Sequence, residues 1–333
     1  RVLFRSREKH PDKAKVYLAE RHMDIVGPKK DNAVLISPFL GDDGRLVAVL
    51  ASRKTAPETT VLSGDDVIVL TGRVSNGFVY LDIPEGRYRL SVIFTTKKGG
   101  GQEHYMNLID RESVKVLIDT VYEPHYERYA ADFGHTFAGF FSDEPELGNA
   151  SGYDFHELPG RPDKKLPWSS ALETRLRGIW EEDFAVNLVA LWFDVGSETV
   201  RIRTEYMDAV SDLVYECFSG QIGQWCGEHH VEYIGHIIED DNAHARLGCS
   251  IGHYFKEMRG QHRAGVDVVH FQIVPGFEET NHQWTTWDSD GEFFHYGLAK
   301  LGSSAAHIDP NKHGRSLCEI FGNYGWALGV SGM

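Results

Sequence analysis

The chain has 333 residues, of which 25% are charged and 41% hydrophobic, as is ordinary for a folded globular protein. Its formal net charge of −15 disfavours nucleic acid and anionic membranes as partners, because both bind basic surfaces. No apolar run approaches the roughly 20 residues needed to cross a bilayer, and no signal peptide is visible at the N-terminus. The length suffices for a full α/β barrel or for two smaller domains.

The cysteines are Cys217, Cys226, Cys249 and Cys318, and none of them forms a CxxC pair. This spacing argues against a structural zinc site. Each lies in an apolar or helical context, so we expect buried free thiols. Such thiols favour a reducing compartment such as the cytoplasm.

The first part of the chain is rich in short β-type runs separated by turn signals such as Asp43-Gly44, Asn76-Gly77 and Pro84-Glu85-Gly86. Strands at this spacing predict a small antiparallel β-sandwich, which we assign to residues 1–86 as an accessory domain. The run Tyr88–Thr96 fits either this domain or the next one. The expected strands are Lys15–Glu20, Ala33–Phe39, Leu46–Arg53, Val67–Leu70, Phe78–Ile83 and Tyr88–Thr96.

From Asp110 onward, helical and strand patterns alternate. Asp110 is a candidate N-cap, Ser169 caps a second helix, and a long amphipathic helix is expected from about Glu198 to Glu228. A βαβα order predicts parallel strands covered by helices. We therefore expect residues 87–333 to form a partial (β/α)8 TIM-type barrel, with strands at Phe137–Phe141, Val231–Ile238, Val266–Val274 and Ser316–Phe321 in addition to Tyr88–Thr96.

Three of the predicted strands end at or contain a glutamate: Glu144, Glu239 and Glu319. The carboxyl ends of strands in one parallel barrel converge on one mouth, where catalytic groups lie. Two carboxyl groups on opposite sides of a pocket are the minimum for glycoside hydrolysis, one as acid and one as nucleophile or base. The alternatives for a single carboxylate are a helix cap, an ion pair with arginine, or a Ca²⁺ ligand.

Polar and aromatic residues near the same strand ends are candidates for substrate binding. His236 and His270 lie just before strand ends, and Gln272 shares a face with His270. Trp284 and Trp326 lie in loops where they could stack on sugar rings, although a single tryptophan is more often part of the core. A lone strand histidine is more often a hydrogen-bonded structural residue than a metal ligand, and we predict no metal ligands here, with Ca²⁺ as the one possible cofactor.

Five segments together resemble glycoside hydrolase family 106, the α-L-rhamnosidases and their relatives, over about residues 86–330. The resemblance implies an eight-stranded α/β barrel with appended β domains, hydrolysis of a terminal sugar from an oligosaccharide or glycoside, inversion of configuration and dependence on calcium. The segments are Phe140-Phe-Ser-Asp-Glu-Pro-Glu146, Leu166-Pro-Trp-Ser169, Gly235-His-Ile-Ile-Glu239, Phe271-Gln-Ile-Val-Pro-Gly276 and Cys318-Glu-Ile-Phe-Gly322.

The resemblance also implies roles for the acidic residues. Glu144 ranks first as general acid, and Glu319 and Glu239 compete for the second role. More distantly, Glu144 and Glu319 look like the acid/base and nucleophile of retaining clan A glycosidases. Asp143 stands where that clan usually has asparagine, and we expect it to contact substrate.

Only five barrel-type strands can be identified, whereas a closed barrel needs eight. The chain also begins with Arg rather than Met. We therefore predict a fragment of a longer protein. Its open sheet edges would favour self-association, and the fragment by itself can be inactive. A carbohydrate-binding protein on a degenerate barrel and a metal-dependent hydrolase of another bond are the alternatives.

Overall fold

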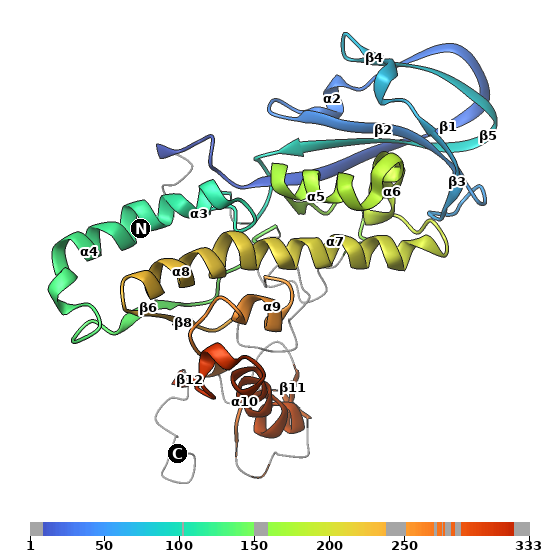
Figure 1. The fold of residues 1–333 in the computed structure, drawn as a ribbon. Coiled ribbons are helices and arrows are strands. Elements are labelled where there is room, and N and C mark those ends of the chain that lie inside the picture. The colour runs from blue at the N-terminus through green and yellow to red at the C-terminus, as the bar shows by residue number, and fades with distance from the viewer. Residues whose placement is uncertain are drawn as a thin grey trace.

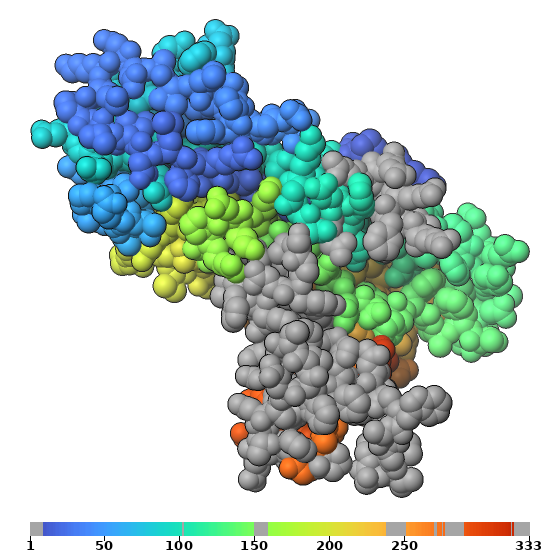
Figure 2. All heavy atoms as spheres, turned by 180° about the vertical axis from the view of Figure 1, so that it is seen from behind, coloured from blue at the N-terminus to red at the C-terminus, as the bar shows by residue number. Residues whose placement is uncertain are grey.

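The computed structural model describes residues 9–101, 103–149, 159–237, 251–269, 272–274, 276, 281–283 and 288–322, with the backbone alone at 281–283, 288, 289 and 321. Figure 1 shows an N-terminal sheet with helices packed beneath it, a long helical rod across the middle, and the C-terminal elements beyond that rod. The helix α10 (Leu298–Ile308) lies below the rod in Figure 1, and Figure 2 shows the N-terminal sheet from behind.

The largest sheet is antiparallel, in the order β3-β2-β5-β1-β7, with β4 paired to β5. In Figure 1 this sheet is visibly curled, and β1 and β5 run through its whole length. Its strands are β1 (Val16–Leu35), β2 (Arg45–Lys54), β3 (Leu62–Val69), β4 (Val74–Ser75), β5 (Phe78–Thr96) and β7 (Leu166–Trp168), and the short helix α2 (Ser37–Leu40) and 3-10 turn η2 (Thr71–Arg73) connect them.

β1 and β5 are each one long bent strand where the sequence predicts two short ones. Their pairing continues through Gly27↔Gly86, and the register shifts next to Pro28 rather than breaking. A methyl group on Gly27 would lie 1.9 Å from the carbonyl oxygen of Pro84, so glycine lets the two backbones pass at this bend. The glycine and proline signals therefore mark a bend within a hairpin, not the ends of strands.

The two faces of the curled sheet pack into different cores. One face closes on itself around residues such as Val49, Leu81 and Leu90. The other contributes Leu18, Leu50 and others to a larger core shared with the helices. Since the second core joins the N-terminal strands to α5–α8, residue 86 lies inside a strand that belongs to both packing units.

The helices begin where the sequence predicts. The Asp110 carboxylate accepts from the Ser113 amide at 2.9 Å, and Ser169 Oγ accepts from the Leu172 amide at 3.1 Å, so both predicted N-caps are confirmed. The predicted helix from Glu198 to Glu228 is also confirmed as one rod, α7–η7–α8. The helices are α3 (Arg111–Leu117), π-helical η3 (Ile118–Tyr122), α4 (Glu123–Tyr129), α5 (Ser170–Trp180), α6 (Phe184–Leu188), α7 (Glu198–Val214), π-helical η7 (Tyr215–Ser219), α8 (Gly220–Glu228), α9 (Tyr254–Met258), π-helical η8 (Phe293–Gly297) and α10, with 3-10 turns η4 (Ala130–Asp132), η5 (Glu181–Asp183), η6 (Val189–Leu191) and η9 (Pro310–Lys312).

Parallel strands occur in two pairs within the described residues. β6 (Gly139–Ser142) pairs with β8 (Glu232–Gly235), and β12 (Ser316–Gly322) pairs with β9 (Ala264–Val269). A further antiparallel pair joins β10 (Asn281–Gln283) to β11 (Asp288–Asp290).

The predicted fold class, a partial (β/α)8 barrel with a separate β-sandwich, is therefore wrong. The described residues form a mixed α/β fold built on a curled antiparallel sheet and helices, without a parallel (β/α)8 barrel. The local order of strands and helices predicted that strands pair in parallel. It did not predict how many strands join one sheet. Among the turn signals that predicted the sandwich, Pro84-Glu85-Gly86 lies at the bend within the long strand β5, opposite the bend of β1.

Two smaller expectations were also tested. Within the described residues, no helix is both long enough and apolar enough to cross a membrane. Cys217 and Cys226 are buried free thiols, as expected, but Cys318 is exposed, because it lies on β12, whose described pairing is with β9 alone. Cys249 lies outside the described residues.

Glycines bring the parallel strands unusually close together. A methyl group on Gly139 would lie 2.0 Å from the Glu232 carbonyl oxygen, and one on Gly235 would lie 2.1 Å from that of Ser142. One on Gly265 would lie 1.6 Å from the carbonyl oxygen of Gly235. Side chains at these positions would push β6, β8 and β9 apart.

We therefore expect Gly265→Ala to lower the free energy of unfolding by about 3 kcal/mol, because backbone, unlike a flexible side chain, cannot yield to the added methyl. Gly72→Ala is the matched control, since a methyl group there meets nothing within 4 Å. Urea denaturation of both variants measures the difference. Equal stability of the two variants would show that the strands are not in close contact at Gly265.

Candidate functional site

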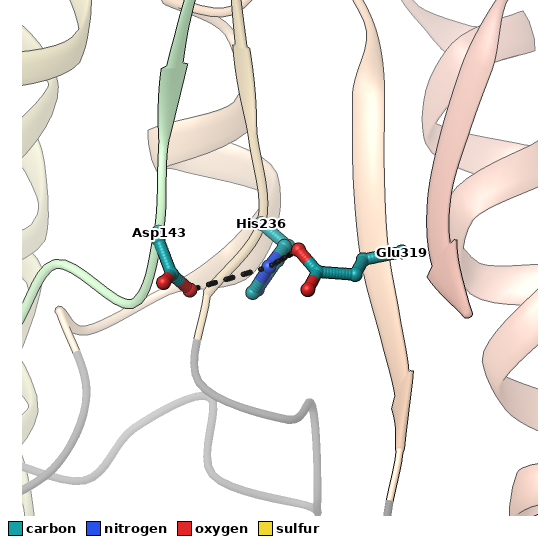
Figure 3. A group of neighbouring side chains, drawn as sticks. All are labelled: Asp143, His236 and Glu319. Carbon is teal, nitrogen blue, oxygen red and sulfur yellow. Dashed lines mark hydrogen bonds and ion pairs between the residues drawn. The ribbon is translucent and has the colours of Figure 1, made fainter. Parts of the chain in front are cut away.

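Three side chains from three different strands meet at one point. Asp143 follows β6, His236 follows β8, and Glu319 lies on β12 (Figure 3). His236 Nε2 lies 3.1 Å from Glu319 Oε2 and 3.5 Å from Asp143 Oδ1, so the ring stands between the two carboxylates. The sequence predicted all three as site residues, and the parallel strands bring them together.

The ring of His236 is buried, with 1% of its side chain exposed, whereas Asp143 is 71% and Glu319 46% exposed. Its Nδ1 is 2.6 Å from the carbonyl oxygen of Ile237, which can only accept, so Nδ1 carries a proton. In a neutral ring Nε2 would then point a lone pair at two carboxylates. A proton on Nε2 removes this repulsion, so the geometry favours the imidazolium.

The surroundings of His236 explain its charge. Burial opposes the charged form and lowers the pKa, but the Ile237 carbonyl and the carboxylates of Asp267, Glu319 and Asp143 outweigh this and raise the pKa of His236 above its ordinary value. The ring is therefore a cation held among acidic groups.

Asp267 is a member of this group that the sequence reasoning missed. It lies on β9, opposite Glu319 in the register, and is 3% exposed. Its signal in the sequence is a single charged residue within the apolar run Ala264-Gly-Val-Asp-Val-Val269. A carboxylate in the middle of a buried strand needs a compensating charge, and here His236 provides one.

Glu144, the predicted general acid, follows Asp143 directly and has a φ of 39°. A non-glycine residue in this region is uncommon and costs about 1–3 kcal/mol unless its surroundings compensate. Such conformations cluster at functional sites. The backbone at Glu144 thus turns sharply at the same rim that carries Asp143.

The other predicted residues lie elsewhere or outside the described part of the chain. Gln272 is buried, and its Oε1 accepts from the Val269 amide at 2.9 Å, so it caps the end of β9. Trp168, a further tryptophan of the chain, is 2% exposed and belongs to the core. Glu239, His270, Trp284 and Trp326 lie outside the described residues.

An apolar pocket of about 300 Å³ opens beside Asp143. Its walls come from β6, from η3 and from η7, and Asp143 and Ser142 stand on its lining. Pockets of this kind, mostly apolar with a few polar groups, are the usual form of small-molecule sites. The lining residues with aromatic rings are Tyr105, Tyr122, Phe140, Phe141 and Phe218.

Asp143, His236 and Glu319 are also the one group of possible metal ligands found within the described ranges, with donor atoms all within 4.8 Å of one another. Calcium takes about 6–8 oxygen ligands, and this group offers carboxylates from two residues and an imidazole nitrogen. The described donors therefore do not fit a calcium ion. One imidazole and two carboxylates are closer to the preferences of zinc.

Comparisons with known proteins give little. No protein-family model and no curated protein matches the chain. Among solved structures, it is similar to a rhamnosidase from Novosphingobium sp. PP1Y, with a TM-score of 0.49 and 14% sequence identity over 74% of this chain. The match covers 22% of that protein, so the chain spans about a fifth of its length. A likeness this distant establishes neither the family nor an activity.

The charge on His236 predicts a pH dependence of stability. Its raised folded pKa means that the contribution is complete below the ordinary value of about 6.5 and is lost as pH rises through the folded value. We expect the stability difference between wild type and His236→Gln to shrink as pH rises from 6 to 8.5, as measured by urea denaturation. His307→Gln is the control, because that exposed ring also bonds a backbone carbonyl but lies outside the site. A difference that grows with pH would contradict the imidazolium.

The conformation of Glu144 predicts a stabilising substitution. Glycine adopts positive φ without steric cost, so Glu144→Gly should raise the free energy of unfolding by about 1 kcal/mol. Glu181→Gly is the matched control, since Glu181 has a φ of 47° at the end of α5. Thermal unfolding compares the two. A loss of stability in the Glu144 variant alone would mean that its side-chain contacts outweigh the backbone strain.

Proposed function

We propose that the chain belongs to a glycoside hydrolase that removes a terminal sugar by carboxylate catalysis. The observation that supports it is the convergence of Asp143 and Glu319 on the buried ring of His236. Acidic groups gathered at one point are costly unless they hold a cation or transfer protons. The substrate in this proposal is an oligosaccharide or glycoside, and the sequence motifs alone favour a rhamnose-like sugar.

Glu319 is the proposed nucleophile or base. Its Oε2 lies 3.1 Å from Nε2 of His236, so the carboxylate is held beside the buried ring. An ionised carboxylate is the form that attacks the sugar carbon or activates a water. Because 46% of the Glu319 side chain is exposed, substrate can reach it.

The proposed acid is a carboxyl group on the segment that leaves β6, either Glu144 or its neighbour Asp143. Donor oxygens of Asp143 and Glu319 lie within 4.8 Å of each other. Carboxyl groups about 5 Å apart are typical of retaining enzymes, so Asp143 as acid implies retention. Glu144 as acid leaves the outcome open. Glu239 stays a candidate for the second carboxylate.

A carbohydrate-binding protein without turnover is the second candidate. It is favoured by the contact of both carboxylates with the same imidazole, because a carboxylate engaged in this way still has lone pairs that accept from sugar hydroxyls. The aromatic pocket beside Asp143 would then serve affinity alone.

The test uses aryl and methyl glycosides with the full chain and the variants Glu319→Gln, Glu144→Gln and Asp143→Asn. We expect Glu319→Gln to lose about 10³-fold in kcat on every substrate, because general acid–base and nucleophilic groups contribute on this scale. Loss of the acid should lower kcat least for nitrophenyl glycosides, because nitrophenolate leaves without protonation. It should lower kcat most for methyl glycosides, whose leaving oxygen needs a proton. The variant with that pattern identifies the acid.

Glu228→Gln is the control, since Glu228 lies at the end of α8 and not in the site. Wild-type rates in the Glu319→Gln variant would remove the hydrolase proposal in this form. Sugar binding by calorimetry without turnover in the wild type would establish the second candidate instead.

A further inference from the structure

Asp143 and Glu144 form what we call the site rim, and the segment that carries them continues into the protein interior. After Asp143 and Glu144 come a buried Pro145 and then Leu147, Gly148 and Asn149, all buried. The side-chain Nδ2 of Asn149 donates to the Lys165 carbonyl at 2.8 Å, which fixes the far end of the segment. The rim is thus the exposed end of a buried stretch of chain.

Two side chains at the start of β1 hold the backbone of this stretch. The ammonium of Lys15 donates to the carbonyl oxygen of Leu147, and the hydroxyl of Tyr17 donates to that of Gly148 at 3.1 Å. Lys15 directly precedes β1 and Tyr17 lies two residues further along the chain, and the two side chains bind consecutive carbonyls. The bonds span 132 and 131 residues of sequence.

Both side chains are themselves fixed. Tyr17 is fully buried, and a methyl group on Gly100 would lie 2.1 Å from its ring, so the loop backbone packs directly on the ring. Lys15 is 2% exposed, and its ammonium lies 5.0 Å from the centre of the Tyr105 ring. A lysine so deeply buried cannot meet substrate.

The charge of Lys15 is costly in this position. Burial lowers its pKa to about 7, and Glu146, on the segment that Lys15 holds, raises it only in part. Tyr105 is the other titratable group that faces it, and burial raises the pKa of Tyr105. The hydrogen bond from the buried amine of Lys15 to the Leu147 carbonyl offsets part of the cost of burying both groups.

We propose that Lys15 and Tyr17 are positioning residues that hold the Asp143–Glu144 rim against the ring of His236. They act on the backbone three and four residues after Glu144, and Pro145 stiffens the chain between Glu144 and these carbonyls. The catalytic consequence rests on the proposed hydrolase function, whereas the mechanical part does not.

The test compares Tyr17→Phe with Tyr206→Phe. Each removes one buried hydroxyl that donates to a backbone carbonyl, but Tyr206 bonds Pro167 of β7, at 2.7 Å, and not the 143–149 segment. We expect Tyr17→Phe to speed hydrogen exchange about fivefold in peptides covering 143–149, and to lower kcat about fivefold with little change in KM. Tyr206→Phe should lose similar stability and leave both readouts as in the wild type.

Lys15→Met provides a second variant, in which a side chain of similar length cannot donate to the Leu147 carbonyl. It should also speed hydrogen exchange in peptides covering 143–149. If Lys15→Met does not fold, Tyr17→Phe carries the test alone. Exchange in 143–149 that is unchanged in Tyr17→Phe, or changed equally in Tyr206→Phe, would overturn the proposal. If the wild type hydrolyses nothing, the hydrolase function fails, and the exchange measurement still decides whether these residues hold the rim.

Discussion

The structure of the site depends on one charge balance. His236 gives up its hydration on burial, and this loss is offset by the carbonyl of Ile237 and by carboxylates contributed from three other strands. The same balance works in reverse, because the buried Asp267 needs a positive neighbour as much as the ring needs negative ones. The attraction between the ring and these carboxylates therefore links β6, β8, β9 and β12, which backbone hydrogen bonds join as two separate pairs in the described residues.

Local features of the fold were predictable from the sequence, and the way they assemble was not. Asp110 and Ser169 cap helices as predicted because capping depends on neighbouring residues only. The pairing of β1 with β5 depends on how Gly27 and Gly86 meet across the sheet, which no local pattern encodes. The same glycine and proline signals fit a turn or a bend, and only the partner strand decides between them.

The sequence predicted where the candidate site lies better than it predicted which residues form it. Strand ends identified Asp143, His236 and Glu319, but Asp143 contacts His236, whereas Glu144 had been ranked ahead of it as a catalytic group. The direction in which Asp143 points depends on the backbone turn next to it, where Glu144 has a φ of 39°. Strand ends do not point to Asp267, because the buried network reaches into the middle of β9.

The long sequence separations in the site have a kinetic meaning. His236 and Glu319 are 83 residues apart, so their contact forms only after a large loop has closed and β12 has docked on β9. An intermediate that has built β8 and β9 but not β12 lacks one of the carboxylates that stabilise the imidazolium. The protonation state of this single ring therefore depends on whether β12 has docked, and the docking of β12 is coupled to the acidity of the medium.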